Sequence, residues 1–261
     1  NMLTPLSWIF DFVKTKTSPR DLAWRLTEVG LNVEQIVTSG KEKILDIEVT
    51  PNRPDWLSIL GVAREIAAIE DVKIKLPEFR EIPKPSASLP IIIKNDFSLC
   101  PRYTAVTVSG VSVKPSPKWL QERLKLVGLR SINNLVDITN YVTAELGVPI
   151  HIFDYGKFKS ETLVVDQAKG GENFTSVDEI SYKLPKGAII IKDNGRVIDL
   201  CGIKGGANTG ISAETKNIFV HVPIYTPALI RRTSKALNLV SPASYIYERG
   251  ANAGGTLETL Q

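Results

Sequence analysis

The sequence predicts an α+β protein, with a small, mainly helical N-terminal domain and a larger mixed domain. Three observations support this fold class. Apolar residues recur at helical spacing in the N-terminal part. Later in the chain, short runs rich in β-branched residues alternate with Gly-rich or Asp-rich turns, which indicates strands. Between these parts, residues 77–90 are rich in proline and charge and indicate an extended linker.

These observations predict four segments. We expect an N-terminal part over residues 1–76, the linker over residues 77–90 and the mixed domain over residues 91–250. The last residues, 251–261, are Gly-rich and are expected to form a flexible tail.

Composition excludes several classes of protein. Of the 261 residues, 43% are hydrophobic and 23% are charged, as in an ordinary soluble globular protein. No apolar run reaches the roughly 18 residues of a membrane span, so we expect no membrane partner. Cys100 and Cys201 lie far apart and fit no metal-binding spacing, and a reducing cytoplasm is the simple interpretation. The net charge of +4 permits contact with RNA phosphates but does not require it.

The N-terminal part is expected to begin with two helices within residues 3–37. An apolar stripe marks the first helix. The second has Ser18 as a cap and Pro19 at its first position, a common helix start. Residues 43–49 alternate between polar and apolar side chains, which predicts a strand.

A tight, proline-rich connection over residues 50–55 is expected to follow this strand and to lead into a helix over residues 57–69. Arg53 lies in this connection. A phosphate contact is one interpretation of Arg53, but the rigidity of the connection favours an ion pair.

The mixed domain is expected to consist of short strands and two flanking helices. The helices are predicted over residues 115–127 and 227–237. The turns are clearest at Gly170-Gly171 and at Asp193-Asn194-Gly195. Strands are predicted over residues 90–95, 103–113, 162–168, 173–177, 188–192 and 217–222.

The run over residues 130–154 is the most informative stretch of the chain. It predicts a loop that leads into a helix, with Asp137 as a plausible cap and Gly147 at the end. Polar residues gather at the start of this helix, and His151 follows its end. Such a helix can line a polar pocket. The spacing alone favours the alternative that the polar side chains cap the helix and that His151 is a hydrogen-bonded core residue.

A second informative stretch is the glycine loop within residues 198–210. Four glycines allow close approach of the backbone to a ligand, but the spacing is not that of a phosphate-binding loop. A tight turn between strands explains the loop equally well. The predicted helix over residues 227–237 is basic, which fits either a solvated face or contact with RNA phosphates.

Four stretches, taken in order along the chain, resemble the β chain of bacterial phenylalanyl-tRNA synthetase. The resemblance implies the N-terminal part and the tRNA-editing domain of that family. It also implies that the inserted OB-fold module is missing between residues 40 and 43, and that the C-terminal modules are absent. The stretches are DIEVTPNRPDWLSILGVAREIAAI (46–69), RSINNLVDITNYVTAELGVPIHIFD (130–154), LCGIKGGANTGISAETKNIF (200–219) and IRRTSKALNLVSPASYIYERG (230–250).

The resemblance also implies partners and an activity. The expected partners are the synthetase α chain and the phenylalanine-specific tRNA, with no DNA partner. No cofactor is expected in this chain, because ATP and Mg²⁺ belong with the α chain and the full complex. The implied role is phenylalanyl-tRNA aminoacylation, with hydrolysis of tyrosine wrongly attached to that tRNA. An aminoacyl ester is activated, so a positioned water and hydrogen-bond donors suffice without a covalent nucleophile.

The resemblance assigns the site residue by residue. The implied catalytic residues are Thr139, Asn140 and His151. The implied substrate-binding residues are Asn134, Gly202, Gly205, His221, Ser241 and Ala243.

His221 departs from the family pattern, which has a glutamate at this position. A neutral imidazole offers one acceptor nitrogen where a carboxylate offers two oxygens. Two hypotheses therefore stay open: an editing hydrolase, or a structural, tRNA-positioning module whose editing has decayed. A metal site is not expected, because two histidines without a neighbouring carboxylate are a weak metal signal.

Overall fold

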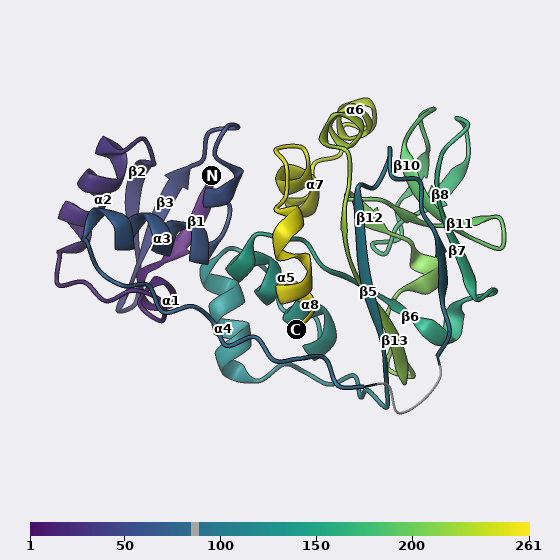
Figure 1. Cartoon of the computed structure of the whole chain (residues 1–261), viewed down its shortest axis with the longest axis horizontal. Coiled ribbons are helices and arrows are strands. Elements are labelled where there is room, and N and C mark those ends of the chain that lie inside the picture. Colours follow the sequence, from purple (N-terminus) through teal and green to yellow (C-terminus); the bar gives the residue numbers. More distant parts are fainter. Residues whose placement is uncertain (85–88) are drawn as a thin grey trace. The chain divides into compact units, whose positions relative to one another are not determined.

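The computed structural model describes residues 1–84 and 89–261 and divides the chain into two compact units. Unit 1 comprises residues 1–80 and 115–148, and unit 2 comprises residues 81–114 and 149–261. This division differs from the predicted one, because residues 115–148 join the N-terminal residues. Residues 85–88 of the expected linker lie outside the described residues. Figure 1 gives the labels of the elements.

Unit 1 contains a three-stranded antiparallel sheet in the order β1-β3-β2. Helices nevertheless hold more residues of unit 1 than this sheet does, and the α+β class is confirmed. Of the two helices expected within residues 3–37, the first is a single turn, Leu6–Ile9, and the second spans Pro19–Glu28. The strands are β1 (Met2–Pro5), β2 (Asn32–Ser39) and β3 (Glu42–Glu48).

Local signals explain where the helices of unit 1 begin and end. Ser18 and Ser58 cap the helices that follow them, each accepting a hydrogen bond from a backbone N–H. Gly147, with φ of +74°, ends α5 in the left-handed conformation that glycine tolerates. The helices are α1 (Leu6–Ile9), α2 (Pro19–Glu28), α3 (Ile59–Ile69), α4 (Lys118–Leu126) and α5 (Asn134–Leu146), with a 3₁₀ turn, η1 (Pro54–Trp56).

The prediction that Asp137 caps α5 is wrong, because the N-cap is Asn133. The Asp137 carboxyl group is fully buried and accepts hydrogen bonds from the hydroxyls of Ser116 and Ser131 and from the N–H of Ile132. Asp137 therefore ties the loop before the helix to a distant part of the chain.

Arg53 is an ion-pair residue, as the sequence favoured. Its guanidinium lies 2.7 Å from Asp55 and 3.2 Å from Glu65, and it stacks over the ring of Trp56 at 3.4 Å. The side chain therefore holds η1 against α3.

Unit 2 contains a five-stranded sheet in the order β12-β11-β10-β7-β4 and a three-stranded sheet in the order β5-β13-β6. All pairs are antiparallel except β4 with β7, and β8 and β9 form a separate hairpin. The strands are β4 (Ile92–Lys94), β5 (Arg102–Ser109), β6 (His151–Asp154), β7 (Thr162–Gln167), β8 (Asn173–Thr175), β9 (Ser181–Lys183), β10 (Ile189–Asp193), β11 (Arg196–Leu200), β12 (Lys204–Gly205) and β13 (Asn217–Ile224).

The helices of unit 2 are α6 (Pro227–Leu237), α7 (Pro242–Tyr247) and α8 (Thr256–Leu260), with 3₁₀ turns η2 (Tyr155–Lys157), η3 (Ala207–Thr209) and η4 (Ala253–Gly255). Helix α8 packs on β13 and β5 (Figure 1). Arg102 of β5 donates a hydrogen bond of 2.6 Å to Thr256, which is fully buried together with Thr259. The residues predicted to form a flexible tail are therefore docked on the sheet. No helix in the described residues is long and apolar enough to cross a membrane.

Candidate functional site

The two histidines of the chain face each other in the three-stranded sheet of unit 2. His151 on β6 and His221 on β13 are directly paired, so their side chains project from the same face of the sheet. Their ring centroids lie 5.7 Å apart, and the ring of Phe153 packs at a steep angle against both, with centroid distances of 4.6 Å to His151 and 4.9 Å to His221. The resemblance placed both histidines in one pocket without giving this pairing.

His221 is enclosed. Only 1% of its surface is exposed, and its Nδ1 atom shares a hydrogen bond of 2.8 Å with the hydroxyl of Tyr103 on β5. Burial lowers the pKa of His221 well below its ordinary value, and the neighbouring His151 lowers it further. His221 is therefore a neutral core histidine whose Nδ1 atom is hydrogen-bonded.

His151 differs because part of its surface stays accessible. Within the described residues, no hydrogen bond engages either of its ring nitrogens. Burial lowers its pKa to about 4, so the imidazole is neutral near pH 7. The ring is held by packing alone and keeps an acceptor nitrogen free for a ligand or a water.

The backbone of Gly205 packs against the imidazole ring of His151. A Cβ atom at this position would lie 2.5 Å from Cε1 and 2.6 Å from Nε2 of the imidazole. The ring therefore packs directly on the glycine backbone, and any side chain at residue 205 displaces it.

Gly202 has a different reason to be glycine. It adopts a φ of +68°, and a Cβ atom there would meet Tyr247 at 2.9 Å, Ile230 at 3.0 Å and Tyr225 at 3.2 Å. Gly202 thus serves the turn between β11 and β12 and the packing of buried side chains around it.

The strand before this turn carries a buried acidic residue. Asp199 is 4% exposed and is directly paired with Gly205 across β11 and β12. Burial raises its pKa to about 8, and burial also raises the pKa of Cys201, two residues on, well above its ordinary value. The hydroxyl of Tyr225 is buried nearby and has no hydrogen-bond partner within the described residues.

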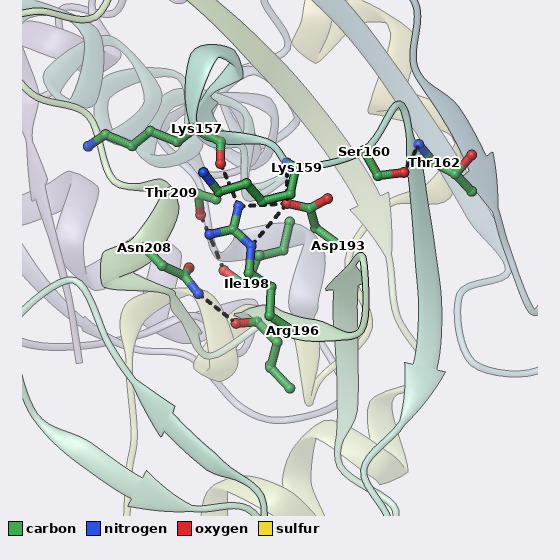
Figure 2. A network of polar contacts seen from close by, with 10 residues as sticks. Lys157, Lys159, Ser160, Thr162, Asp193, Arg196, Ile198, Asn208 and Thr209 are labelled. Atoms are coloured by element: carbon green, nitrogen blue, oxygen red, sulfur yellow. Dashed lines mark hydrogen bonds and ion pairs between the residues drawn. The ribbon is translucent and has the colours of Figure 1, made fainter.

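A polar network holds the turn between β10 and β11, at the end of β11 away from the glycine loop (Figure 2). The guanidinium of Arg196 donates to the carboxylate of Asp193 at 2.6 Å and to the carbonyl of Lys157 at 2.5 Å. Asn208, within the glycine loop, donates to the carbonyl of Val197 at 2.9 Å, which ties the loop to the strand before it. The loop that carries Gly205 is therefore anchored on both sides.

Ser241 and Ala243 lie at the start of α7. Ser241 is the N-cap: its hydroxyl accepts from the N–H of Ser244, and the Ser244 hydroxyl accepts from the N–H of Ser241. Ala243 is half-buried in the first turn. The hydroxyl of Ser241 is thus engaged in a capping box.

The remaining predicted site residues belong to unit 1, on α5. Thr139 is buried and donates a hydrogen bond of 2.7 Å from its hydroxyl to the carbonyl of Val136. Asn134 and Asn140 are half-buried. The structure therefore brings together His151, Gly205 and His221 within unit 2, and it assigns the three α5 residues to the other unit.

A cavity of about 530 Å³ opens in unit 2 between β4 and β5. Apolar side chains form most of its wall, and Tyr103 and Phe219 line it from the sheet that carries the histidines. Among the described ranges, 1–84 and 89–261, no cluster of three or more His, Cys, Asp or Glu residues is placed to hold a metal ion.

A family model described as the B3/4 domain matches residues 99–261, more than half of the chain. The chain belongs to the B3/4 domain family. All nine site residues that the sequence resemblance assigned fall inside the matched B3/4 region.

Relatives of this B3/4 protein carry the name phenylalanine–tRNA ligase beta subunit. The Thermotoga maritima protein is 41% identical over 86% of this chain and 28% of its own length. The Geobacter sulfurreducens protein is 45% identical over 81% of this chain and 27% of its own length. The Rhodopirellula baltica protein is 38% identical over 97% of this chain and 38% of its own length. The chain therefore spans well under half the length of these curated relatives.

One solved structure also matches this B3/4 protein. It is an N-terminal fragment of the phenylalanyl-tRNA synthetase beta-subunit from Pyrococcus horikoshii, with 17% identity and a TM-score of 0.46. The match covers 90% of this chain and 72% of that chain.

The sequence did not point to Asp199, Tyr103 or Tyr225 as site residues. The one signal for Asp199 is an acidic residue in the middle of an otherwise apolar run, VIDLCGI. Tyr103 and Tyr225 carry no local signal, because their importance comes from strand pairing and from packing against distant residues.

Proposed function

We propose that this chain serves in phenylalanyl-tRNA synthesis as part of a phenylalanine–tRNA ligase beta subunit. We further propose that unit 2 hydrolyses the ester of tyrosine wrongly attached to the phenylalanine-specific tRNA. The similarity to beta subunits from several bacteria supports the first statement. Its partners in this proposal are that tRNA and the α chain, in the cytoplasm, with ATP and Mg²⁺ used by the α chain and the full complex.

The observation that carries the hydrolytic proposal is the state of His151. It is a partly accessible, neutral imidazole whose ring nitrogens are unengaged within the described residues, packed on Gly205. A neutral imidazole accepts a hydrogen bond from water and can align that water with the carbonyl carbon of an activated ester. Because the ester is activated, alignment of the water supplies much of the required rate.

Two possible nucleophiles of unit 2 are unsuited to a covalent mechanism. Cys201 is 1% exposed, and burial keeps its thiol protonated, whereas a thiolate is the reactive nucleophile. The hydroxyl of Ser241 is occupied in the capping box of α7. Direct attack by water is therefore the mechanism that we propose.

A second candidate is a structural, tRNA-positioning module that has lost editing. The enclosure of His221 favours it, because a residue that is 1% exposed and bonded to Tyr103 is not available to recognise a substrate. A pocket without a hydrogen-bonding group for the tyrosine hydroxyl discriminates weakly between tyrosine and phenylalanine.

The test is hydrolysis of tyrosyl-tRNA, charged on the phenylalanine-specific tRNA, by the purified chain, with phenylalanyl-tRNA as the control. Faster loss of tyrosine than of phenylalanine supports editing. Loss at the spontaneous rate, both at low salt with high protein and at physiological salt, supports the second candidate, because weak phosphate contacts are strengthened at low salt.

A further inference from the structure

Asp199 stands apart from the other buried aspartates of the chain. Five aspartates are less than a tenth exposed: Asp46, Asp137, Asp154, Asp193 and Asp199. The first four each accept a hydrogen bond from an N–H or O–H group. Within residues 1–84 and 89–261, the one donor recorded for Asp199 is the thiol of Cys201, which is a weak donor.

No cation compensates Asp199 either. None of the ion pairs recorded in the described residues includes it, whereas Asp193 on the neighbouring strand is paired with Arg196 at 2.6 Å (Figure 2). The groups that act electrostatically on Asp199 or are acted on by it are neutral hydroxyls and thiols, of Tyr103, Tyr225, Tyr247 and Cys201. A buried carboxyl group without a cation or strong donors is costly unless a ligand supplies the partner.

The sheet register places this carboxyl group at the proposed hydrolytic site. Asp199 and Gly205 are opposite each other in an antiparallel pair, so their side-chain directions share one face, with Cβ positions about 5 Å apart. On that face, the imidazole of His151 occupies the space of a Gly205 side chain. Asp199 therefore lies beside His151, with 4% of its surface still accessible.

The two neighbouring histidines are neutral and cannot balance a negative charge on Asp199. Burial keeps His151 and His221 uncharged near pH 7, so neither provides a counter-cation for Asp199. A ligand with a positive group completes the site. The α-ammonium group of an aminoacyl ester is such a group, and it lies two bonds from the carbonyl carbon that water attacks.

We propose that Asp199 is an anionic subsite beside His151 that binds the α-ammonium group of an α-aminoacyl ester. The inference rests on the proposed hydrolytic function and deepens it. Binding converts the Asp199 carboxylic acid to a carboxylate paired with the ammonium, and the proton that leaves goes to solvent. The subsite therefore selects a free amino group over an acylated one.

The first experiment measures binding alone. The purified chain is titrated calorimetrically with tyrosine amide at pH 6 in two buffers of different ionisation enthalpy, and with N-acetyltyrosine amide as the uncharged control. We expect tyrosine amide to bind with release of about one proton per site, because Asp199 is protonated at this pH in the free protein and ionised in the complex. N-acetyltyrosine amide is expected to bind at least tenfold more weakly without proton release.

Two matched variants isolate the residue. Asp199→Asn keeps the shape but not the charge, and is expected to lose both the proton release and the preference for the free amine. Asp193→Asn changes a buried aspartate on the adjacent strand and is expected to keep both, once a thermal melt shows that it is folded. Equal binding of the two amides by the unaltered chain, no binding of tyrosine amide, or an unchanged preference in Asp199→Asn each overturns the proposal.

A second experiment separates this inference from the proposed function. Hydrolysis of tyrosyl-tRNA and N-acetyltyrosyl-tRNA is compared in the unaltered chain and in Asp199→Asn. If tyrosine amide binds with proton release but neither ester is hydrolysed, the subsite stands and the hydrolytic function fails. If both esters are hydrolysed equally by both proteins, the function stands and the subsite fails.

Discussion

His151 and His221 lie directly opposite each other on β6 and β13, with ring centroids 5.7 Å apart, but their environments differ. His221 is enclosed and bonded to Tyr103, whereas His151 is partly accessible and has no hydrogen bond to its ring nitrogens within the described residues. The pairing places an enclosed histidine beside a partly accessible one, so substitutions at the two positions are expected to have different effects.

Replacing His221 by Phe removes the partner of the buried Tyr103 hydroxyl. We expect the free energy of unfolding to fall by about 1–3 kcal/mol, the cost of leaving a buried polar group unpaired. Chemical denaturation measures this loss. The double variant with Tyr103→Phe removes both partners and is expected to be more stable than the sum of the single losses predicts. Strictly additive losses would contradict the coupling.

Replacing Gly205 by Ala places a methyl group about where the His151 ring lies, 2.5 Å from Cε1. The ring must move, so we expect deacylation of tyrosyl-tRNA to fall by at least about tenfold, since small displacements of catalytic groups are costly. Stability is expected to fall as well, by about 1–3 kcal/mol, because the ring and its neighbours must shift to make room for the methyl group.

Gly202→Ala is the matched control for this glycine loop. Gly202 has a φ of +68°, and the added methyl group would lie 2.9 Å from Tyr247. We therefore expect a loss of stability of about 1–3 kcal/mol. A Gly205→Ala variant that hydrolyses tyrosyl-tRNA at the unaltered rate would show that the position of the His151 ring is irrelevant to the reaction.

Ser241→Ala removes the cap of α7 and is expected to lower the free energy of unfolding by about 1 kcal/mol. Ser241→Asp keeps a capping side chain and is expected to restore that stability, as measured by thermal melts. The pair also tests the assignment of Ser241 to substrate binding. Loss of deacylation in a stable Ser241→Asp variant would indicate that the hydroxyl contacts the substrate as well as the helix.

Stability should depend on pH through Asp199. The pKa of this carboxyl group is about 8 in the folded chain and about 4 in the unfolded chain, so the folded state binds more protons between these values. The stabilising contribution is complete below pH 4 and is lost as pH rises to about 8, at up to about 1.4 kcal/mol per pH unit.

Asp199→Asn removes this dependence. Denaturant unfolding of both proteins from pH 4.5 to pH 8 is therefore expected to show a difference in stability that grows with pH in favour of the variant. Burial of His151 acts in the opposite direction, because its lowered pKa makes stability fall as pH falls from 6.5 to about 4, and it is common to both proteins. Parallel pH profiles would contradict the burial of an uncompensated carboxyl group.

Elements with local signals were predicted well. Helix α6 (Pro227–Leu237) has the predicted bounds, because Pro227 at its first position and the apolar spacing both act within the segment. Gly147 ends α5 for the same kind of reason. The cap of α5 was wrong, since Asp137 is drawn to Ser116, a residue whose proximity no local pattern predicts.

Two short strands were missed. Strands β6 (His151–Asp154) and β11 (Arg196–Leu200) are four and five residues long, too short for a clear periodic signal. The family resemblance pointed to His151, Gly205 and His221, but the position of Asp199 depends on the β11–β12 register. That register is set by the folded hairpin and not by residue spacing.

The most direct test of the account compares the unaltered chain with His151→Ala in the hydrolysis of tyrosyl-tRNA at pH 7. Because His151 is partly accessible, nearly equal unfolding curves are expected and serve as the control. The account predicts that the unaltered chain removes tyrosine at least about a hundredfold faster than the variant, the scale of a positioned proton acceptor. Equal rates in two equally stable proteins would contradict it, and a large loss of stability in His151→Ala would make His151 a core residue.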